Sequence, residues 1–422
     1  MRINRHMLRA AVCALSFSFL VKPLSDNPYF PIFRDNWWWI FESDSNFAVD
    51  GFFISGHQAW DITSRQITIP MLAGELDLQQ LSQATRILGV PDPMPTAWQG
   101  PGTIPVYIVG KLQGQGINFE WHQKIYEDIV AFGAQWYFVA LDNTQRFSIA
   151  NGSEREMNAI VNLLLGPGDR DKLDEVRRAY FQEFGITGTS FSGSGFGDID
   201  FYLQLGKTFD HEFKVRELKV GGRLGLVTPT GHARENNVAG SIPFGGNGFW
   251  GGYITVYAVA EVKEDFRLGC YLQLSKRFAD TKVIRVSVAG EPAIFGATVA
   301  PIHISPGMMV QLSPFLFMDN IREGFGLGFV YNITQHRRDQ LEDRRSEQLQ
   351  KEYPLRLPEM SQKTKWNSSY LTLSAYYDFG ATKPVHGFEP IVSVRWDVPV
   401  EWTGVRQVVK ANKLSIGLDF VF

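Results

Sequence analysis

The last ten residues of the chain, KLSIGLDFVF at positions 413–422, alternate strictly between apolar and polar side chains. The apolar face consists of Leu414, Ile416, Leu418, Phe420 and Phe422, and the other face carries Lys413, Ser415, Gly417 and Asp419. A period of two is that of a β-strand with one oily side and one polar side. A soluble sheet would leave the final aromatic side chain in water, whereas a lipid-facing strand places it at the membrane boundary. We therefore expect the last strand to face lipid.

The same segment resembles the C-terminal signal of bacterial outer-membrane β-barrels, in which a polar residue, a glycine and two aromatic residues close the last strand. Ser415, Gly417, Phe420 and Phe422 match that pattern in order. The resemblance implies that the barrel-assembly machinery is a partner and reads Gly417, Phe420 and Phe422 as an assembly signal. Alternating decapeptides also occur in soluble sheets, so the rest of the chain must decide between the two classes.

Composition narrows the choice. The chain has 422 residues, 44% of them hydrophobic and 14% aromatic, with a formal net charge of −3. These values suit either one to three soluble domains or a single barrel. After the first 25 residues no run reaches the roughly 18 apolar residues of a spanning helix, which excludes a helical membrane protein. The near-neutral charge gives no reason to expect nucleic acid as a partner.

The N-terminus has the layout of a secretory signal peptide. Arg2, Arg5 and Arg9 precede an apolar stretch over residues 10–21, and the small residue Ser25 follows shortly afterwards. We expect a signal peptide at residues 1–25; the alternative is a buried N-terminal helix. Cleavage would leave Cys270 as the single cysteine, so no intramolecular disulfide is expected.

From position 196 onward the chain falls into alternating segments of about ten residues, the length that crosses a bilayer when tilted. Short connections at residues 210–214, 263–265, 319–323 and 380–384 alternate with long ones at residues 229–247, 279–305 and 336–366. Transmembrane barrels show this asymmetry, with tight turns on the periplasmic side and long loops outside. Earlier segments at residues 47–57, 104–113 and 130–141 also look like strands. The sequence thus predicts an all-β fold, a transmembrane antiparallel barrel of about 12 strands over residues 46–422, with 14 as the alternative.

Three other segments interrupt this pattern. Residues 69–88 form one insertion, and residues 153–185 form a second that is predicted to be helical, with Ser153 and Glu156 as a capping box. Residues 26–45, which contain Trp37, Trp38 and Trp39, are expected to be either an interfacial aromatic anchor or a plug inserted into the barrel.

If the apolar faces point to lipid, a set of charged residues points inward. These candidate lumen-lining residues are Asp198, Asp200, Lys219, Arg223, Arg267, Arg277, Glu389, Arg395, Asp397 and Asp419. A charge on the lipid face would cost about 2–4 kcal/mol near the midplane of the membrane. This cost determines which face of each strand points to lipid. Hairpin symmetry places Arg395 opposite Asp419 and Asp200 near Arg223, and it gives Arg267 no acidic partner. Such charges either neutralise each other or create a transverse field in an open pore.

One hairpin resembles a more specific family of barrels. Gly197-Asp198-Ile199 begins a strand, and residues 218–231, LKVGGRLGLVTPTG, end the next one. This resembles outer-membrane barrels associated with aromatic-compound degradation (the phenol meta-pathway), related in shape to the long-chain fatty-acid transporters. The resemblance implies a barrel, and it hints at hydrophobic cargo, against which the charged lumen argues.

Signals for an enzyme are weak. No H-x-x-x-H or cysteine-containing metal spacing occurs, so no metal site or cofactor is expected. His232 with Asn236 and Asn237 approximates an outer-membrane phospholipase site, yet no serine stands two residues away. We expect no catalysis, but a channel in the outer-membrane lipid that passes small solutes of unknown identity. The alternative is an adhesin or interaction protein that acts through outer loops such as the charged residues 337–352.

Overall fold

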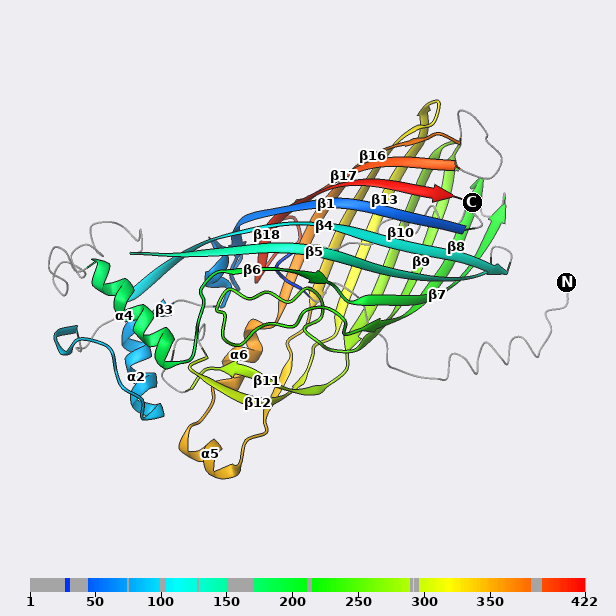
Figure 1. The fold of residues 1–422 in the computed structure, drawn as a ribbon. Helices are drawn as coiled ribbons and strands as arrows, with labels where there is room; N and C mark the ends of the chain where they lie inside the picture. Colours follow the sequence, from blue (N-terminus) through cyan, green and yellow to red (C-terminus); the bar gives the residue numbers. More distant parts are fainter. Residues whose placement is uncertain are drawn as a thin grey trace.

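The computed structural model describes residues 27–30, 45–73, 76–98, 104–126, 129–149, 170–210, 215–288, 291, 296–380 and 389–421. Within these residues, 12 antiparallel strands close into one barrel (Figure 1). The barrel strands are β1 (Ser45–Trp60), β4 (Pro105–Tyr126), β5 (Val130–Ile149), β7 (Ile199–Asp210), β8 (Glu217–Thr228), β9 (Gly251–Lys263), β10 (Phe266–Arg277), β13 (Met309–Arg322), β14 (Phe325–His336), β16 (Trp366–Asp378), β17 (Glu389–Pro399) and β18 (Val408–Val421). The predicted fold class and the expected count of 12 are confirmed.

Closure depends on β1, which pairs with both its neighbours. It runs antiparallel to β18 from Asn46 opposite Val421, and antiparallel to β4 from Ser45 opposite Gln123. Every other barrel strand pairs with the strand that precedes it and the strand that follows it around the wall. Because no barrel strand keeps an open edge along its full length, the main-chain groups of the wall are hydrogen-bonded within the sheet, as a hydrocarbon environment requires.

The two ends of the barrel differ. At one end, called the turn end here, two-residue connections join β9 to β10 and β13 to β14, and the C-terminal end of β18 also lies there (Figure 1). At the other end, called the loop end, the long connections carry further structure. Since the strands alternate in direction, connections of alternating length gather at opposite ends, as the sequence predicts. Among the described residues, no helix combines the length and apolar character needed to cross a membrane.

The long connections at the loop end are more ordered than the sequence predicts. Three strands, β11 (Asp280–Val286), β12 (Thr298–Ser305) and β15 (Gln340–Asp343), form a separate small sheet. The helices α5 (Glu347–Glu352) and α6 (Leu357–Lys363) follow β15. The sequence predicts these stretches only as long connections.

A helical cap covers the far end of β4 and β5, which extend well past the other strands (Figure 1). Its first part contains β2 (Gln66–Thr68), η2 (Ile69–Ala73), β3 (Leu76–Asp77), α2 (Leu78–Leu88) and η3 (Thr96–Trp98). Asp77 caps α2 by accepting a hydrogen bond from the Gln79 amide. In the second predicted insertion, α4 (Arg170–Glu183) is helical, whereas the expected capping box at Ser153 lies outside the described residues.

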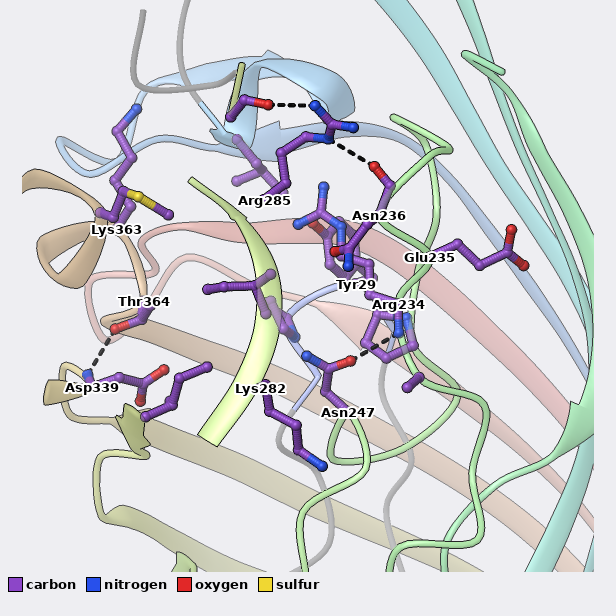
Figure 2. Close-up of a pocket in the computed structure, with 18 of the residues that line it drawn as sticks. Tyr29, Arg234, Glu235, Asn236, Asn247, Lys282, Arg285, Asp339, Lys363 and Thr364 are labelled. Carbon is purple, nitrogen blue, oxygen red and sulfur yellow. Dashed lines mark hydrogen bonds between the residues drawn. The ribbon is translucent and has the colours of Figure 1, made fainter. Parts of the chain in front are cut away.

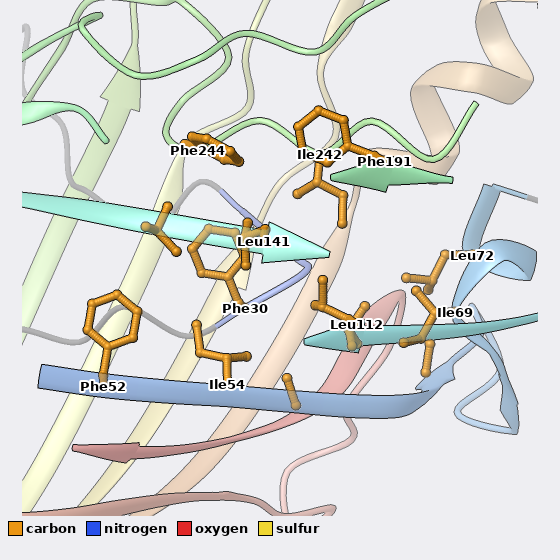
Figure 3. Close-up of a cluster of buried hydrophobic side chains, with 14 of the residues drawn as sticks. Phe30, Phe52, Ile54, Ile69, Leu72, Leu112, Leu141, Phe191, Ile242 and Phe244 are labelled. Atoms are coloured by element: carbon orange, nitrogen blue, oxygen red, sulfur yellow. The ribbon is translucent and has the colours of Figure 1, made fainter. Parts of the chain in front are cut away.

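Apolar side chains fill part of the barrel interior at the loop end (Figure 3). Phe52 and Ile54 of β1 meet Leu112 of β4 and Leu141 of β5, and all four are nearly inaccessible to solvent. Phe30, from the N-terminal segment, packs into the same cluster. The main-chain amide of Val409 in β18 donates to the carbonyl of Pro28, so residues 27–30 lie against the inner wall. The tryptophans at positions 37–39 and the expected signal peptide lie outside the described residues.

Candidate functional site

The outer and inner faces of the wall have opposite chemistry. The large apolar residues of the expected lipid face are exposed: Leu203, Leu205, Leu224, Leu226, Leu272, Leu274, Val392, Val394, Trp396, Leu414, Ile416 and Leu418. Most side chains between them on the same strands, such as Gln204, Arg395 and Ser415, are buried. A closed barrel with such an apolar outer face is an outer-membrane β-barrel protein, because only lipid makes that exposure favourable.

Most of the candidate lumen-lining residues have described side chains, and all of these are buried. They are Asp198, Asp200, Lys219, Arg223, Arg267, Arg277, Arg395, Asp397 and Asp419, each 9% exposed or less. Glu389 begins β17, and its side chain is outside the described set. That these residues line a conducting path stays a prediction.

The expected positions of Arg395 opposite Asp419 and of Asp200 near Arg223 are wrong in register. Arg395 lies opposite Ser415 rather than Asp419, and its guanidinium contacts the carboxylate of Asp50 on β1. Asp200 lies opposite Val227 and accepts a hydrogen bond of 2.7 Å from Tyr253, whose strand is two positions away. The predictions assumed a symmetric register about each connection, and the true registers differ by several residues.

Arg267 also departs from the prediction that it has no acidic partner. Its Nε atom lies 2.5 Å from a carboxylate oxygen of Asp319 on the neighbouring strand β13. Tyr376 of β16 donates a hydrogen bond to the same carboxylate. This cluster lies near the turn end, where sequence reasoning looked for partners only within the β9–β10 hairpin.

Polar side chains from every barrel strand form a belt on the inner wall. The belt consists of Asp50, Asn118, Glu120, Gln135, Tyr202, Gln204, Arg223, Thr255, Gln273, Tyr271, Gln311, Ser313, Asn332, Thr372, Arg395, Asp397 and Lys413. These residues come from all 12 barrel strands. Sequence analysis listed Arg223, Arg395 and Asp397 of this belt as candidate lumen residues and missed Asp50 and Glu120. It also missed the uncharged members, because Asn, Gln, Ser and Thr on alternating strands give no distinctive signal.

One half of the belt is a chain of hydrogen bonds across five consecutive strands of the wall. Ser313 donates to Asn332 at 2.6 Å, and Asn332 donates to Thr372 at 3.2 Å. Thr372 then donates to Asp397 at 2.5 Å, and Asp397 pairs with Lys413 at 3.0 Å. Each link joins neighbouring strands, so the side chains reinforce the main-chain ladder at this level.

The other half crosses the point where the barrel closes. Arg395 pairs with Asp50, Asn118 donates to Asp50 at 3.4 Å, and Gln135 donates to Asn118 at 3.0 Å. Since these contacts run from β17 over β1 to β4 and β5, they join the two ends of the chain. Breaking one buried partner of such a pair is costly because the other charge stays behind.

The belt continues from β4 to β10 through an aromatic side chain. Tyr202 donates to Glu120 at 3.1 Å, and the guanidinium of Arg223 lies 4.3 Å from the centre of the Tyr202 ring. Thr255 lies opposite Arg223 in the sheet and donates to Gln273 at 2.9 Å. A cation over an aromatic face is stabilised further when it is shielded from water.

The two motifs that suggested a family are in contact. Gly197 and Asp198 separate β6 (Phe191–Phe196) from β7, and β6 pairs only with β5 among the described strands. Thr230 donates to the carbonyl of Gly197 at 3.0 Å, and the Gly231 amide donates to Asp198 at 2.9 Å. A Cβ at Gly197 would lie 1.9 Å from the Tyr137 ring, so no side chain fits there.

Asp198 is the centre of this junction. Its second carboxylate oxygen accepts a hydrogen bond of 2.7 Å from the Gly246 amide and lies 2.9 Å from Nη1 of Arg277. Both side chains are almost fully buried, at 1% and 2% exposure. The Asp198 carboxylate therefore links the β6–β7 junction to Gly231 and Gly246 of the β8–β9 connection. It also links this junction to Arg277 of β10.

The residues of the expected assembly signal differ in what the structure shows. A Cβ at Gly417 would lie 2.2 Å from Asp50 and 2.5 Å from Ser393, so the belt itself requires glycine at this position. Phe420 is half-buried near the turn end, and Phe422 is outside the described residues. Recognition by the assembly machinery stays a prediction.

A cavity of about 470 Å³ opens at the loop end, between the barrel wall, the N-terminal segment and the small sheet (Figure 2). Pro28 and Tyr29 form part of its lining, as do Arg277 and Trp366 from the wall. Its volume falls in the range of small-molecule sites. Sequence analysis missed it because residues from six separate connections between barrel strands line it.

His232, which with Asn236 and Asn237 approximates a phospholipase site, lies in the connection between β8 and β9. The Nε2 atom of His232 lies 3.2 Å from Glu235, and its ring packs beside Phe244, as a loop histidine does. In the part of the chain that the structure describes, no three His, Cys, Asp or Glu side chains are placed to hold a metal ion.

Comparisons with known proteins match the fold. No family model matches the chain, and no curated protein matches its sequence. Among solved structures, an outer-membrane channel from Pseudomonas putida F1 is 10% identical, with a TM-score of 0.49 over 95% of this chain and 100% of that one. The monoaromatic hydrocarbon channel CymD is 10% identical, with a TM-score of 0.34 over 95% and 97%. A FadL homologue from Pseudomonas aeruginosa is 8% identical, with a TM-score of 0.32 over 90% of each chain. At this identity, these likenesses concern the fold alone.

Proposed function

We propose that the protein is a channel through which small solutes pass the outer membrane by diffusion. The observation that carries the proposal is the belt of polar side chains on the inner wall, together with the cavity at the loop end. A wall that serves only as an anchor gains nothing from burying so many polar groups, since an apolar interior would be as stable or more stable. A polar inner surface is what a path for water and solutes needs.

The N-terminal segment would control this path. Residues 27–30 lie against the inner wall, where Asn27 donates a hydrogen bond of 2.7 Å to the carbonyl of Pro243 and Phe30 packs against β1, β4 and β5. Of the two expectations for residues 26–45, this placement favours a plug for its first few residues. We therefore expect the resting conductance to be low and its opening to require movement of this segment.

Conductance in a planar bilayer tests the proposal. The full chain is compared with a variant from which residues 26–30 are deleted after the signal peptide, and flux of a small sugar into liposomes serves as a second measurement. The deletion should increase both conductance and flux. As a matched control, deletion of residues 347–352, which form the exposed helix α5, should change neither.

Absence of conductance and flux from both the full chain and the 26–30 deletion would overturn the channel. The competing function, surface interaction through the outer loops, would then have to show itself as binding that the 347–352 deletion abolishes.

A further inference from the structure

Cationic side chains line the loop-end cavity, and Arg234, Lys282 and Arg285 are three of them (Figure 2). Arg234 comes from the connection between β8 and β9, and Lys282 and Arg285 come from β11. The Nε atom of Arg285 donates at 2.7 Å to the carbonyl of Asn236, two residues beyond Arg234. Burial lowers the pKa of Arg285, the carboxylate of Glu291 raises it, and the positive charge of Arg234 lowers it. Like charges brought together in this way favour an anion between them.

The acids in the lining are engaged elsewhere. Glu235 faces His232 at 3.2 Å, and Asp339 accepts a hydrogen bond of 2.7 Å from the Gly307 amide. Glu291 is an acid whose charge acts on Arg285, and its carboxylate accepts hydrogen bonds from the amides of Val288 and Ala297 at 2.8 and 2.6 Å. Arg285 donates to the carbonyls of Phe184 and Gly296, at 2.9 and 2.6 Å.

The positive charge of Lys282 is partly compensated by neighbouring groups. Its Nζ atom donates to the carbonyl of Gly248 at 2.8 Å and lies 3.1 Å from Asp280, whose side chain is 57% exposed. The ammonium group also lies 5.0 Å from the centre of the Phe249 ring. An exposed pair of this kind is weak, so Lys282 keeps most of its attraction for an anion in the cavity.

Apolar groups make up much of the remaining lining: Tyr29, Leu72, Ile108, Phe181, Ile186 and Ile304. A site with a cationic cluster and an apolar lining suits a ligand that has both characters. We propose that this cavity binds a small organic anion with an apolar body, its acidic group held beside Arg234 and Lys282. The inference rests on the proposed function, because such an anion would be the solute that enters the channel.

Equilibrium binding tests the site independently of permeation. Isothermal titration calorimetry of the full chain in detergent uses three probes: phenyl phosphate, inorganic phosphate and benzyl alcohol, with protein-free micelles as background. Phenyl phosphate should bind more tightly than either other probe, since only it combines the anionic group with the ring. Its affinity should also fall as salt is raised. Equal binding of inorganic phosphate would overturn the apolar part of the proposal, and equal binding of benzyl alcohol would overturn the anionic part.

Substitutions locate the site. The double variant Arg234→Gln/Lys282→Gln should weaken phenyl phosphate binding by about tenfold or more, as expected for loss of charge-assisted hydrogen bonds. Lys282→Arg keeps the charge and should bind nearly as the parent does. Lys207→Gln is the matched control, because Lys207 lies 4.5 Å over the Phe209 ring on the outward stretch of β7 at the turn end. Unchanged affinity in the double variant would overturn the inference.

The two proposals fail in different ways. Phenyl phosphate binding that the double variant abolishes, in a protein that does not conduct even without residues 26–30, would sustain the anion site and overturn the channel. Conductance without preferential phenyl phosphate binding would sustain the channel and overturn the anion site.

Discussion

The ion pair between Asp198 and Arg277 allows the most direct test of how the wall is held together. Replacing Asp198 by Asn removes one charge from a pair whose side chains are 1% and 2% exposed. It also removes one of the two acceptors that bind the amides of Gly231 and Gly246. Removing one partner of a buried ion pair costs about 3–5 kcal/mol, because the remaining charge is left without compensation. We expect Asp198→Asn to lower the free energy of unfolding by about 3 kcal/mol or more.

An exposed pair supplies the control. Glu342 and Arg344 lie 2.8 Å apart, nearly the separation of the buried pair, but their side chains are 63% and 53% exposed. Glu342→Gln should therefore change the unfolding free energy by about 1 kcal/mol at most. The double variant Asp198→Asn/Arg277→Met should recover part of the loss, since it removes both buried charges.

Urea unfolding of the refolded protein, followed by tryptophan fluorescence, measures these differences through the shift in midpoint at constant slope. If Asp198→Asn and Glu342→Gln lose the same stability within about 1 kcal/mol, the argument that burial governs the strength of this pair is refuted.

Three further expectations concern phase, pH and assembly. With Cys270 replaced by Ser, a cysteine at Leu272 should react with membrane-embedded reagents and one at Gln273 with water-soluble ones. The reverse pattern would show that the lipid-facing and lumen-facing sides of β10 are assigned the wrong way round. Burial raises the pKa of Glu291 from 4.5 to about 8. The Glu291 carboxyl therefore binds its proton more tightly in the folded protein than in the unfolded chain. The stability that this contributes is complete below about pH 4.5 and is lost as pH rises through about 8. Hydrogen exchange near residue 291 should increase over that window and become flat with pH in Glu291→Gln; a flat profile in the parent would contradict this. Phe420→Ser should lower the amount of heat-modifiable barrel in the outer membrane, and normal assembly would count against the terminal signal.

The face of each strand could be predicted from the sequence because lipid imposes a strong and local rule. Leu414, Ile416 and Leu418 must point outward, so Ser415 and Asp419 must point inward, whatever the rest of the fold does. The rule depends only on the period of two and needs no knowledge of neighbouring strands.

The partners of the inward residues could not be predicted because they depend on register and closure. Arg395 finds Asp50 at a separation of 345 positions, where the first strand meets the last. No periodicity encodes that contact. The loop-end cavity escaped prediction for a similar reason, since its lining comes from connections whose small sheet, β11, β12 and β15, is also non-local.

Charges that are paired across the wall contribute little to the selectivity of a channel, which depends on charges left over after pairing. Arg267 was expected to act as an unpaired cation, yet it lies 2.5 Å from Asp319. Neutralising it with Arg267→Gln should expose the charge of Asp319 and shift the reversal potential in a salt gradient toward cations. The double variant Arg267→Gln/Asp319→Asn should return selectivity to that of the parent, because no net charge is then added or removed. A cation shift that persists in the double variant would show that Arg267 acts as a free lumen charge, and that the contact with Asp319 does not compensate it.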